Sequence, residues 1–226
     1  MLIYRNSLVA AGLWLLVTLF STQASAQSHP AGVLVETTTT QVMEVVAAAD
    51  IYVDADPERY YRQVQDLLDP LIDYRGFARK VMGPYASSDR YRSLDEAGRE
   101  QLRDQLDQFT NVMRSSLIRT YSKGLLAFGG SRIELAPPND GEPVDAEAST
   151  LSLRQLIYAD RRDPYVVMYQ MGLEKSGEWK LNNVIIESVN LGEVYRDQFL
   201  ASAREEDGNL DAVISGWTTV VVDVEK

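Results

Sequence analysis

The sequence contains no cysteine and only one histidine, His29, in 226 residues. The lack of cysteine excludes a disulfide framework, a thiol nucleophile, and zinc or iron–sulfur centres held by thiolates. One histidine is too few for a histidine-rich metal site, and a Ser-His-Asp triad would have to be built around His29 alone. Basic residues are also scarce, 22 against 33 acidic ones, which leaves a net charge of −11. This charge argues against a nucleic-acid partner and against electrostatic adhesion to an anionic bilayer.

The N-terminus has no apolar run long enough to span a bilayer, but it has the parts of a secretory signal peptide in order. Arg5 supplies a positive charge, residues 8–20 form an apolar run of 13 residues, and Ala24-Ser25-Ala26 is a small-residue cleavage site. A membrane span needs about 20 apolar residues, so an uncleaved anchor is the weaker alternative. We expect residues 1–26 to be a signal peptide and residues 27–226 to form a single exported domain. An exported chain without disulfides suits a bacterial periplasm.

The first half of the mature chain is predicted to be helical. Apolar residues recur at three- and four-residue spacings over 31–50, and Pro57 suits the first turn of a second helix. A third helix is expected between Pro70 and the stop signal Gly83-Pro84. His29, which precedes these elements, is expected in a frayed N-terminus of the mature chain.

A long amphipathic helix is predicted to follow. Ser93-Leu94-Asp95-Glu96 has the pattern of a capping box, with Ser93 as N-cap and Glu96 at the third helical position. Gly129-Gly130 is the expected stop, which gives a helix of about 30 residues. Its apolar series is Leu102, Leu106, Phe109, Met113, Leu117, Tyr121 and Leu125.

The second half is predicted to be rich in strands. Strand candidates cover 149–158, 164–174 and 178–190, with a short one at 132–135. The turn at residues 175–178 predicts that the second and third form an antiparallel hairpin. Helices are expected again over 193–206 and 210–222, the last with Asn209 as N-cap. Helices followed by an antiparallel sheet imply an α+β domain in which helices cover one face of the sheet.

Few residues offer chemistry. The acids of the loop at 137–147 could chelate calcium, but their spacing does not match an EF-hand, and a solvated loop is the simpler interpretation. Glu187 is expected on the same strand face as Asn183, where it could serve as a general base in a small cone-shaped isomerase. The alternative is a structural carboxylate at a strand end. The many large apolar residues on strands and helices fit either a thick core or an enclosed apolar cavity.

The C-terminal third contains a recognisable series of segments, Tyr169–Met171, Gly177–Leu191, Tyr195–Phe199 and Gly208–Ile214. Together with weaker agreement at Phe77–Tyr85, Asp95, Phe109 and Tyr121-Ser122, this series resembles the MlaC family, periplasmic phospholipid-binding proteins also called toluene-tolerance auxiliary components. The family pattern usually has an aromatic residue followed by Asp. This sequence has Asn182 in place of the aromatic residue and Asn183 in place of the Asp. Ser188 and Asn190 replace a usual Gly and Ser.

The resemblance implies a curved antiparallel sheet wrapped by helices around a deep apolar pocket for phospholipid acyl chains. It further implies a carrier between an outer-membrane lipoprotein–porin complex and an inner-membrane ABC transporter. No catalytic residue, metal or cofactor is expected, and the carrier is expected to be a monomer. Since the mature chain carries a net charge of −12, we expect it to dock on basic patches of protein partners rather than on anionic bilayers.

The expected pocket walls come from the long helix and the two best strands. The candidate lipid-binding residues are Phe109, Met113, Leu117, Val167, Tyr169, Met171, Val184 and Ile186. Each of them could instead fill the core. Two other functions stay open at this stage: an isomerase or hydrolase that uses Glu187 with a tyrosine, and a ligand-free periplasmic interaction protein.

Overall fold

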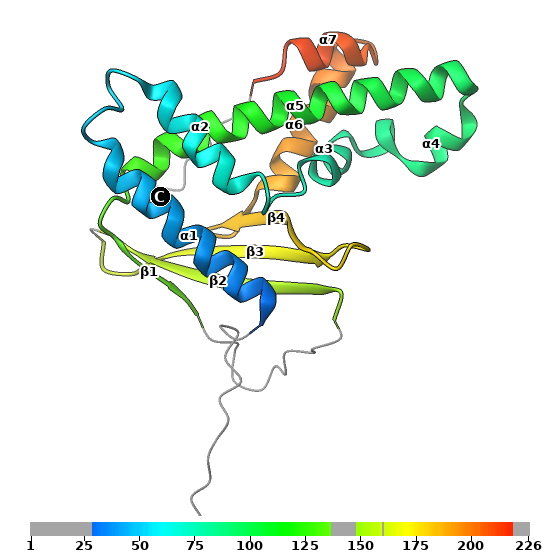
Figure 1. The fold of residues 1–226 in the computed structure, drawn as a ribbon. Coiled ribbons are helices and arrows are strands. Elements are labelled where there is room, and N and C mark those ends of the chain that lie inside the picture. The colour runs from blue at the N-terminus through cyan, green and yellow to red at the C-terminus, as the bar shows by residue number, and fades with distance from the viewer. Residues whose placement is uncertain (1–28, 137–147, 160, 219–226) are drawn as a thin grey trace, which may run out of the picture.

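The computed structural model describes residues 29–136, 148–159 and 161–218, which form a helical layer over one face of a five-stranded antiparallel sheet (Figure 1). The strands are β1 (Arg132–Leu135), β2 (Thr150–Tyr158), β3 (Tyr165–Leu173), β4 (Trp179–Ile186) and β5 (Val189–Asn190). The helices are α1 (Pro30–Ala49), α2 (Pro57–Leu68), α3 (Tyr74–Met82), α4 (Ser88–Ser93), α5 (Glu96–Leu126), α6 (Leu191–Glu205) and α7 (Leu210–Ser215), with a 3-10 turn at Gly83–Ala86. The α+β fold predicted from the sequence, with a curved antiparallel sheet covered by helices, is confirmed.

Two predicted segments, the signal peptide at 1–26 and the acidic loop at 137–147, lie outside the described residues. Within the described ranges, none of the helices is both long and apolar enough to cross a membrane. The same part of the chain holds no group of three or more acidic or histidine side chains arranged to bind a metal ion.

The sheet is a meander in which each strand pairs with the next one along the chain. The hairpin between β3 and β4 closes where the Glu174 N–H donates to the Glu178 carbonyl and Gly177 takes a φ of 86°. Positive φ is the conformation that glycine adopts at little cost. The antiparallel hairpin predicted from the turn at residues 175–178 is therefore confirmed.

The strand predicted over 178–190 is wrong in its second half. β4 ends at Ile186, and the chain turns back at Glu187 and Ser188 to form the short edge strand β5. Both turn residues have positive φ, 49° and 72°, as a two-residue hairpin turn of the primed type requires. Neither Glu nor Ser is a usual residue of such a turn. The apolar pattern alone therefore predicted one continuous strand.

Local side-chain caps set the helix starts. The Asp56 carboxylate accepts from the Arg59 N–H ahead of Pro57, and the Asn209 side chain accepts from the Ala212 N–H, as predicted for the start of α7. His29 is not frayed. Its Nδ1 accepts from the Ala31 N–H at 3.2 Å, and its ring meets the edge of the Trp179 ring with centroids 5.0 Å apart.

The predicted capping box at the start of α5 is also wrong. The N-cap is Asp95, whose carboxylate accepts from the Gly98 N–H at 2.8 Å. Ser93 ends the short helix α4, which the sequence did not predict, and its hydroxyl donates to the Arg90 carbonyl. The length of the helix is as expected, 31 residues, although it ends at Leu126, before the two glycines.

The C-terminal helices differ from prediction at their boundaries. Helix α6 starts at Leu191 rather than 193, because the Asn190 side chain caps it by accepting from the Glu193 N–H. Helix α7 ends at Ser215 with Gly216 as its C-cap, not at 222. Residues 219–222 lie outside the described part of the chain.

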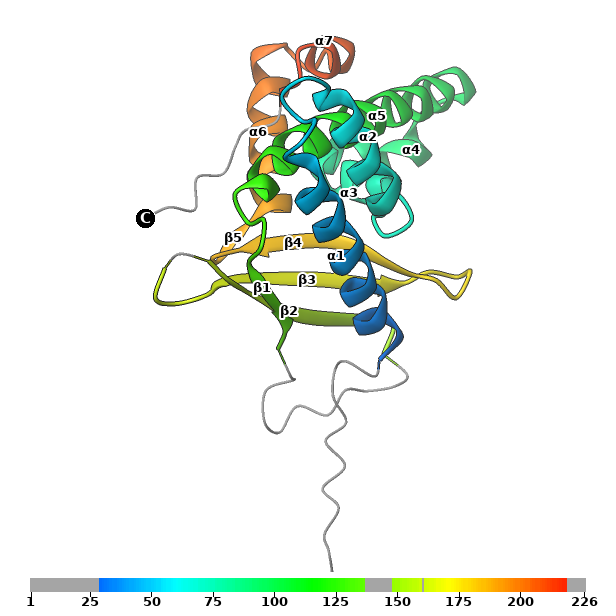
Figure 2. The same ribbon diagram turned by 60° about the vertical axis from the view of Figure 1, so that its left-hand side comes forward.

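Three apolar clusters hold the described residues together. The largest joins α3, α5, α6 and α7 within the helical layer. The second packs Ala31 and Val35 of α1 on the sheet, and the third packs the C-terminal half of α1 on α2. Helix α1 thus runs diagonally from the sheet to the helical layer (Figure 2).

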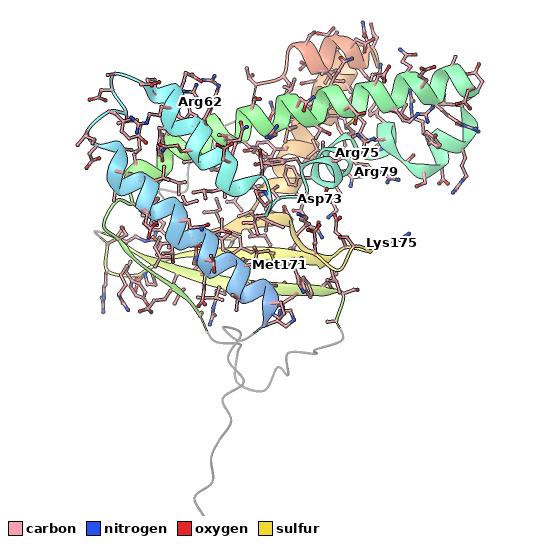
Figure 3. All side chains as sticks on the ribbon, viewed as in Figure 1. Arg62, Asp73, Arg75, Arg79, Met171 and Lys175 are labelled. Atoms are coloured by element: carbon pink, nitrogen blue, oxygen red, sulfur yellow. The ribbon has the colours of Figure 1, made fainter. Side chains whose placement is uncertain are left out.

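A backbone bridge ties the helical layer to β4. The Leu181 N–H donates to the Leu71 carbonyl at 2.8 Å, and the Leu181 carbonyl accepts from the Asp73 N–H at 3.1 Å. Asp73 is also the N-cap of α3, with its carboxylate on the Gly76 N–H (Figure 3). One short segment therefore fixes the start of α3 against the sheet.

Candidate functional site

One face of the sheet points toward the helices, and the register arranges its side chains in rows. The rows are Leu153–Tyr169–Val184, Gln155–Val167–Ile186 and, nearer the hairpin, Leu151–Met171–Leu181. Directly opposite residues in an antiparallel pair share a face. Val35 of α1 packs with Leu153 and Met171, so this face is the one that the helices cover (Figure 3).

The five strand residues predicted from the sequence to bind lipid all lie on this helix-facing side. Val167 and Met171 are buried, whereas Tyr169, Val184 and Ile186 are only half-buried. Their grouping by strand face is as predicted. Their contact with lipid stays a prediction.

A hydrogen-bonded chain crosses the middle of this apolar face. The Tyr169 hydroxyl donates to the Gln155 amide oxygen at 2.7 Å, and the Gln155 amide nitrogen donates to the Thr39 hydroxyl of α1 at 3.0 Å. Gln155 is 3% exposed, so both ends of its amide need these partners. The chain fixes α1 over β2 and β3.

Tyr169 combines a deep position with accessible surface. Burial raises the pKa of its hydroxyl above the ordinary tyrosine value, yet the side chain is only half-buried by area. A side chain deep between two layers keeps accessible surface only where neighbouring atoms leave space unfilled. Tyr169, Val184 and Ile186 therefore keep accessible surface on the helix-facing side of β3 and β4.

The helical layer presents half-buried side chains of its own next to these strands. Leu117 and Tyr121 of α5 are half-buried and pack on the same cluster as Val184 and Ile186. The Tyr121 hydroxyl lies 2.6 Å from that of Tyr195 on α6, which links the two helices. Burial raises the pKa of both hydroxyls, so each is neutral at physiological pH. This part of the interior is thus apolar, with only neutral polar groups.

The remaining two predicted residues are placed differently. Phe109 and Met113 are fully buried inside the helical layer. The Phe109 ring packs on Phe199 and Trp217, with centroids 4.9 and 5.1 Å away. Phe109 and Met113 therefore lie inside the largest cluster, whereas Leu117, Val184 and Ile186 are partly buried against it.

Sequence reasoning missed Gln155 and Tyr121 as members of this interior. Both positions carried a signal. Gln155 lies two residues from both Leu153 and Ile157 on β2 and therefore shares their buried face. Tyr121 belongs to the apolar series of α5. The Gln155 amide made that position look exposed, and Tyr121 was counted in the apolar series but not among the lipid-binding candidates. The polar partner of each comes from a distant segment.

Asn183, which replaces a usual Asp of the MlaC pattern, has a structural role. Its amide nitrogen donates to Gln170 at 3.0 Å and to Asn190 at 2.8 Å, and its amide oxygen accepts from the Gly192 N–H at 3.1 Å. It thereby joins β3 and β4 to the start of α6. An amide suits this position because it both donates and accepts.

Glu187, the candidate general base, is held as a structural carboxylate. It accepts from the Val166 N–H and forms an ion pair with Arg161 at 3.0 Å. Burial raises the pKa of Glu187, but the Val166 hydrogen bond and the Arg161 charge outweigh it, so the pKa is lowered overall. A general base working near neutral pH needs a raised pKa, so this environment is unsuited to that role.

Two hollows lie on the described surface away from the sheet. One, of about 320 Å³, lies between α1 and α2 and includes Val45, Ala48 and Leu67. The other, of about 180 Å³, lies between the start of α5 and the start of α7 and includes Leu102 and Asn209. Neither contains a predicted lipid-binding residue.

Comparison with known proteins places this geometry in a family. The family model described as MlaC protein matches residues 36–219, which is most of the chain. The chain belongs to the MlaC family. Its helix-facing strand residues, its α5 and its α6 all fall inside the matched range.

Two known proteins are similar to this chain, one in sequence and one in fold. The toluene tolerance protein ttg2D of Pseudomonas putida is 27% identical over 212 residues, 93% of this chain and 90% of that one. A phospholipid-binding protein from Ralstonia solanacearum, solved in complex with a phospholipid, has the same fold. It matches with a TM-score of 0.63 and 18% identity, over 82% of this chain and 97% of that chain.

Proposed function

We propose that residues 27–226 form a non-enzymatic phospholipid carrier of the periplasm, exported by a cleaved signal peptide at 1–26. The carrier takes the acyl chains of a phospholipid into the space between the helical layer and the helix-facing side of β3 and β4. It moves lipid between an outer-membrane lipoprotein–porin complex and an inner-membrane ABC transporter.

One observation carries this proposal. Tyr169, Val184 and Ile186 face the helices from central strands, where a solid core would bury them completely, and yet they keep accessible surface. Leu117 and Tyr121 of α5 are half-buried against the same cluster as Val184 and Ile186. Accessible apolar surface inside a two-layer fold is what a lipid-binding interior requires. Membership of the MlaC family and the phospholipid-bound structural relative support the same ligand.

The energetics of lipid transfer favour an interior site over a surface groove. Each buried methylene contributes roughly 0.8 kcal/mol, so about 30 methylenes of two acyl chains represent on the order of 20 kcal/mol. A carrier must replace nearly all of that burial to remove a lipid from a bilayer. The two surface hollows, of about 320 and 180 Å³, are small and are lined in part by charged side chains, so neither can enclose whole chains.

The first experiment tests the ligand. The mature chain, residues 27–226, is produced in a bacterial periplasm, purified without detergent, and analysed by native mass spectrometry and solvent extraction. We expect diacyl phospholipid at near-stoichiometric occupancy. A lipid-free protein that also takes no lipid from vesicles would contradict the carrier function. It would favour the alternative that the chain is a ligand-free interaction protein.

The second experiment locates the site. Val167→Glu places a charge on the helix-facing side and is expected to abolish copurified lipid, because an unpaired carboxylate in an apolar interior is costly. Met168→Glu is the matched control on the opposite face, where Arg154 lies across the strand pair. Occupancy unchanged in Val167→Glu and lost in Met168→Glu would move the site to the outer face.

A filling variant keeps the test decisive if Val167→Glu fails to fold. Val184 is half-buried, so Val184→Trp adds apolar volume where space remains and is expected to lower lipid occupancy severalfold in a folded protein. Ile185→Trp, on the outer face, is the control. Full occupancy in Val184→Trp would show that acyl chains do not pass this position.

A further inference from the structure

The groove between α1 and α2 has the form of a docking site for an apolar side chain. Val45 and Ala48 of α1 and Leu67 of α2 supply its apolar part. Its polar lining residues are Gln41, Glu44, Arg59 and Gln63. The Arg59 guanidinium lies 4.2 Å from the centroid of the Tyr52 ring, which also borders the groove. Its volume of about 320 Å³ is at the lower end of the range for ligand pockets.

Ile51 precedes the groove-lining Tyr52 in the chain and is exposed to solvent. It is 91% exposed, the most exposed of the large apolar side chains in the described residues. Helical spacing continues the groove-lining series from Glu44 and Ala48 to Ile51, and the turn is ordered by the Val53 N–H, which donates to the Ala49 carbonyl at 2.8 Å. Ile51 is held in a hydrogen-bonded turn with its side chain in solvent. A partner can therefore bind it without the free-energy cost of first ordering a loop.

The acidic charge of the chain is concentrated around the same hairpin. Residues 36–66 contain seven acidic and two basic side chains, a net charge of −5 within a chain of −11. Glu44, Asp50 and Asp54 form no ion pair with any residue that the structure describes, so their charge is free to act on a partner. The two basic side chains are Arg59, over the Tyr52 ring, and Arg62 on α2 (Figure 3).

We propose that the α1–α2 hairpin is a docking surface for a basic, amphipathic segment of a protein partner. An apolar side chain of that segment enters the groove beside Ile51, and its lysines or arginines face Glu44, Asp50 and Asp54. The acidic surroundings oppose insertion of Ile51 into an anionic bilayer. This inference rests on the proposed carrier function, because a carrier must dock on protein complexes at both membranes.

The test uses a defined probe. An amphipathic helical peptide of about 18 residues built from leucine and lysine is titrated into the mature chain, with a leucine–glutamate peptide of the same spacing as the comparison. We expect the basic peptide to bind, its affinity to fall with added salt, and amide shifts in the NMR spectrum to cluster over residues 41–67. We expect Ile51→Asp and Glu44→Lys each to raise Kd by about tenfold.

Val33→Asp is the matched control, since Val33 is also exposed, at 49%, but lies near the opposite end of α1. Equal loss of affinity in Val33→Asp and Ile51→Asp would overturn the proposal, as would equal binding of the acidic peptide. Two further outcomes would also overturn it. One is dimerisation of the chain that Ile51→Asp abolishes, measured by sedimentation, and the other is binding to phosphatidylglycerol vesicles that Ile51→Asp abolishes.

Lipid extraction from the same preparations separates the two proposals. Ile51→Asp is expected to keep its lipid, because Ile51 lies outside the sheet–helix interior. Lipid-loaded wild-type protein that fails to bind the basic peptide would overturn the docking surface alone. Lipid-free wild-type protein that binds the peptide at the groove would overturn the carrier function and leave the docking surface in place.

Discussion

At Ser188 the backbone has a φ of 72°. This left-handed conformation is strained for any residue that has a Cβ atom, because the Cβ approaches the backbone carbonyl oxygen too closely. Ser188 belongs to the turn between β4 and β5. Its hydroxyl forms no hydrogen bond with any residue that the structure describes. We therefore expect Ser188→Gly to stabilise the protein by roughly 0.5 to 1 kcal/mol, measured by urea denaturation.

The control for this change is Ser176→Gly in the β3–β4 turn. There the positive φ belongs to the neighbouring Gly177, so a second glycine relieves no strain. It adds freedom to the unfolded chain and removes the exposed hydrogen bonds between the Ser176 hydroxyl and Glu178. We expect Ser176→Gly to destabilise slightly. Equal effects of the two substitutions would show that strain at Ser188 is not the cause.

Substitution of Glu187 tests two things: how the stability of the fold depends on pH, and whether the residue acts in catalysis. Because its pKa is lowered on folding, the carboxylate stabilises the protein above the unfolded value of about 4.3, and this contribution is lost as pH falls through the folded value. We expect Glu187→Gln to cost about 1 kcal/mol at pH 7 and progressively less below pH 4.

Lipid occupancy is the second measurement on Glu187→Gln. The residue pairs with Arg161 at the strand end, so we expect occupancy to stay at the wild-type level. A turnover activity that wild-type protein shows and Glu187→Gln lacks would instead favour the isomerase or hydrolase interpretation.

Among the elements, the start of α5 shows how a small shift in a cap changes a prediction. The Asp95 carboxylate accepts from the Gly98 N–H, while Ser93 completes α4. We expect Asp95→Ala to lower the free energy of unfolding by about 1 kcal/mol. Ser93→Ala is expected to change it by a few tenths at most, and chemical denaturation of the two variants decides between the two caps.

Helices and strands were largely predictable because their periodicity is local. The apolar spacing over 31–50, Pro57 and the series from Leu102 to Leu125 located α1, α2 and α5 to within a few residues. Errors arose where a terminus depends on one side chain. Asn190 starts α6 early, and the positive φ of Glu187 and Ser188 breaks a strand that apolar spacing alone makes continuous.

At the scale of the whole molecule, buried tyrosines couple stability to alkaline pH. Burial raises the pKa of Tyr60 to about 12, helped by the charges of Tyr52 and Tyr61, and burial also raises the pKa values of Tyr74, Tyr121, Tyr169 and Tyr195. The unfolded value is near 10. Since the neutral form is favoured in the folded state, this stability is present below pH 10 and is lost as pH rises toward 12 and beyond.

We expect the phenolate absorbance of these five tyrosines to appear together with loss of circular dichroism. The reference is the titration of the same chain in denaturant, where all twelve tyrosines are exposed and ionise near pH 10. Ionisation of all twelve near pH 10 in a protein that stays folded would contradict the burial of these hydroxyls.

The sequence by itself determined the α+β class, the order of the main elements, the family resemblance and the strand face that Val167, Tyr169 and Met171 share. These follow from local periodicity and from motifs that are read along the chain. Packing between elements decided that Phe109 and Met113 are fully buried in the largest cluster, while Leu117, Val184 and Ile186 are only half-buried against it. It also decided that Gln155 pairs with Thr39, 116 residues away, and that α1 and α2 form a groove beside Ile51. Such contacts depend on how layers pack, and the spacing of residues within one element does not determine which neighbour covers it.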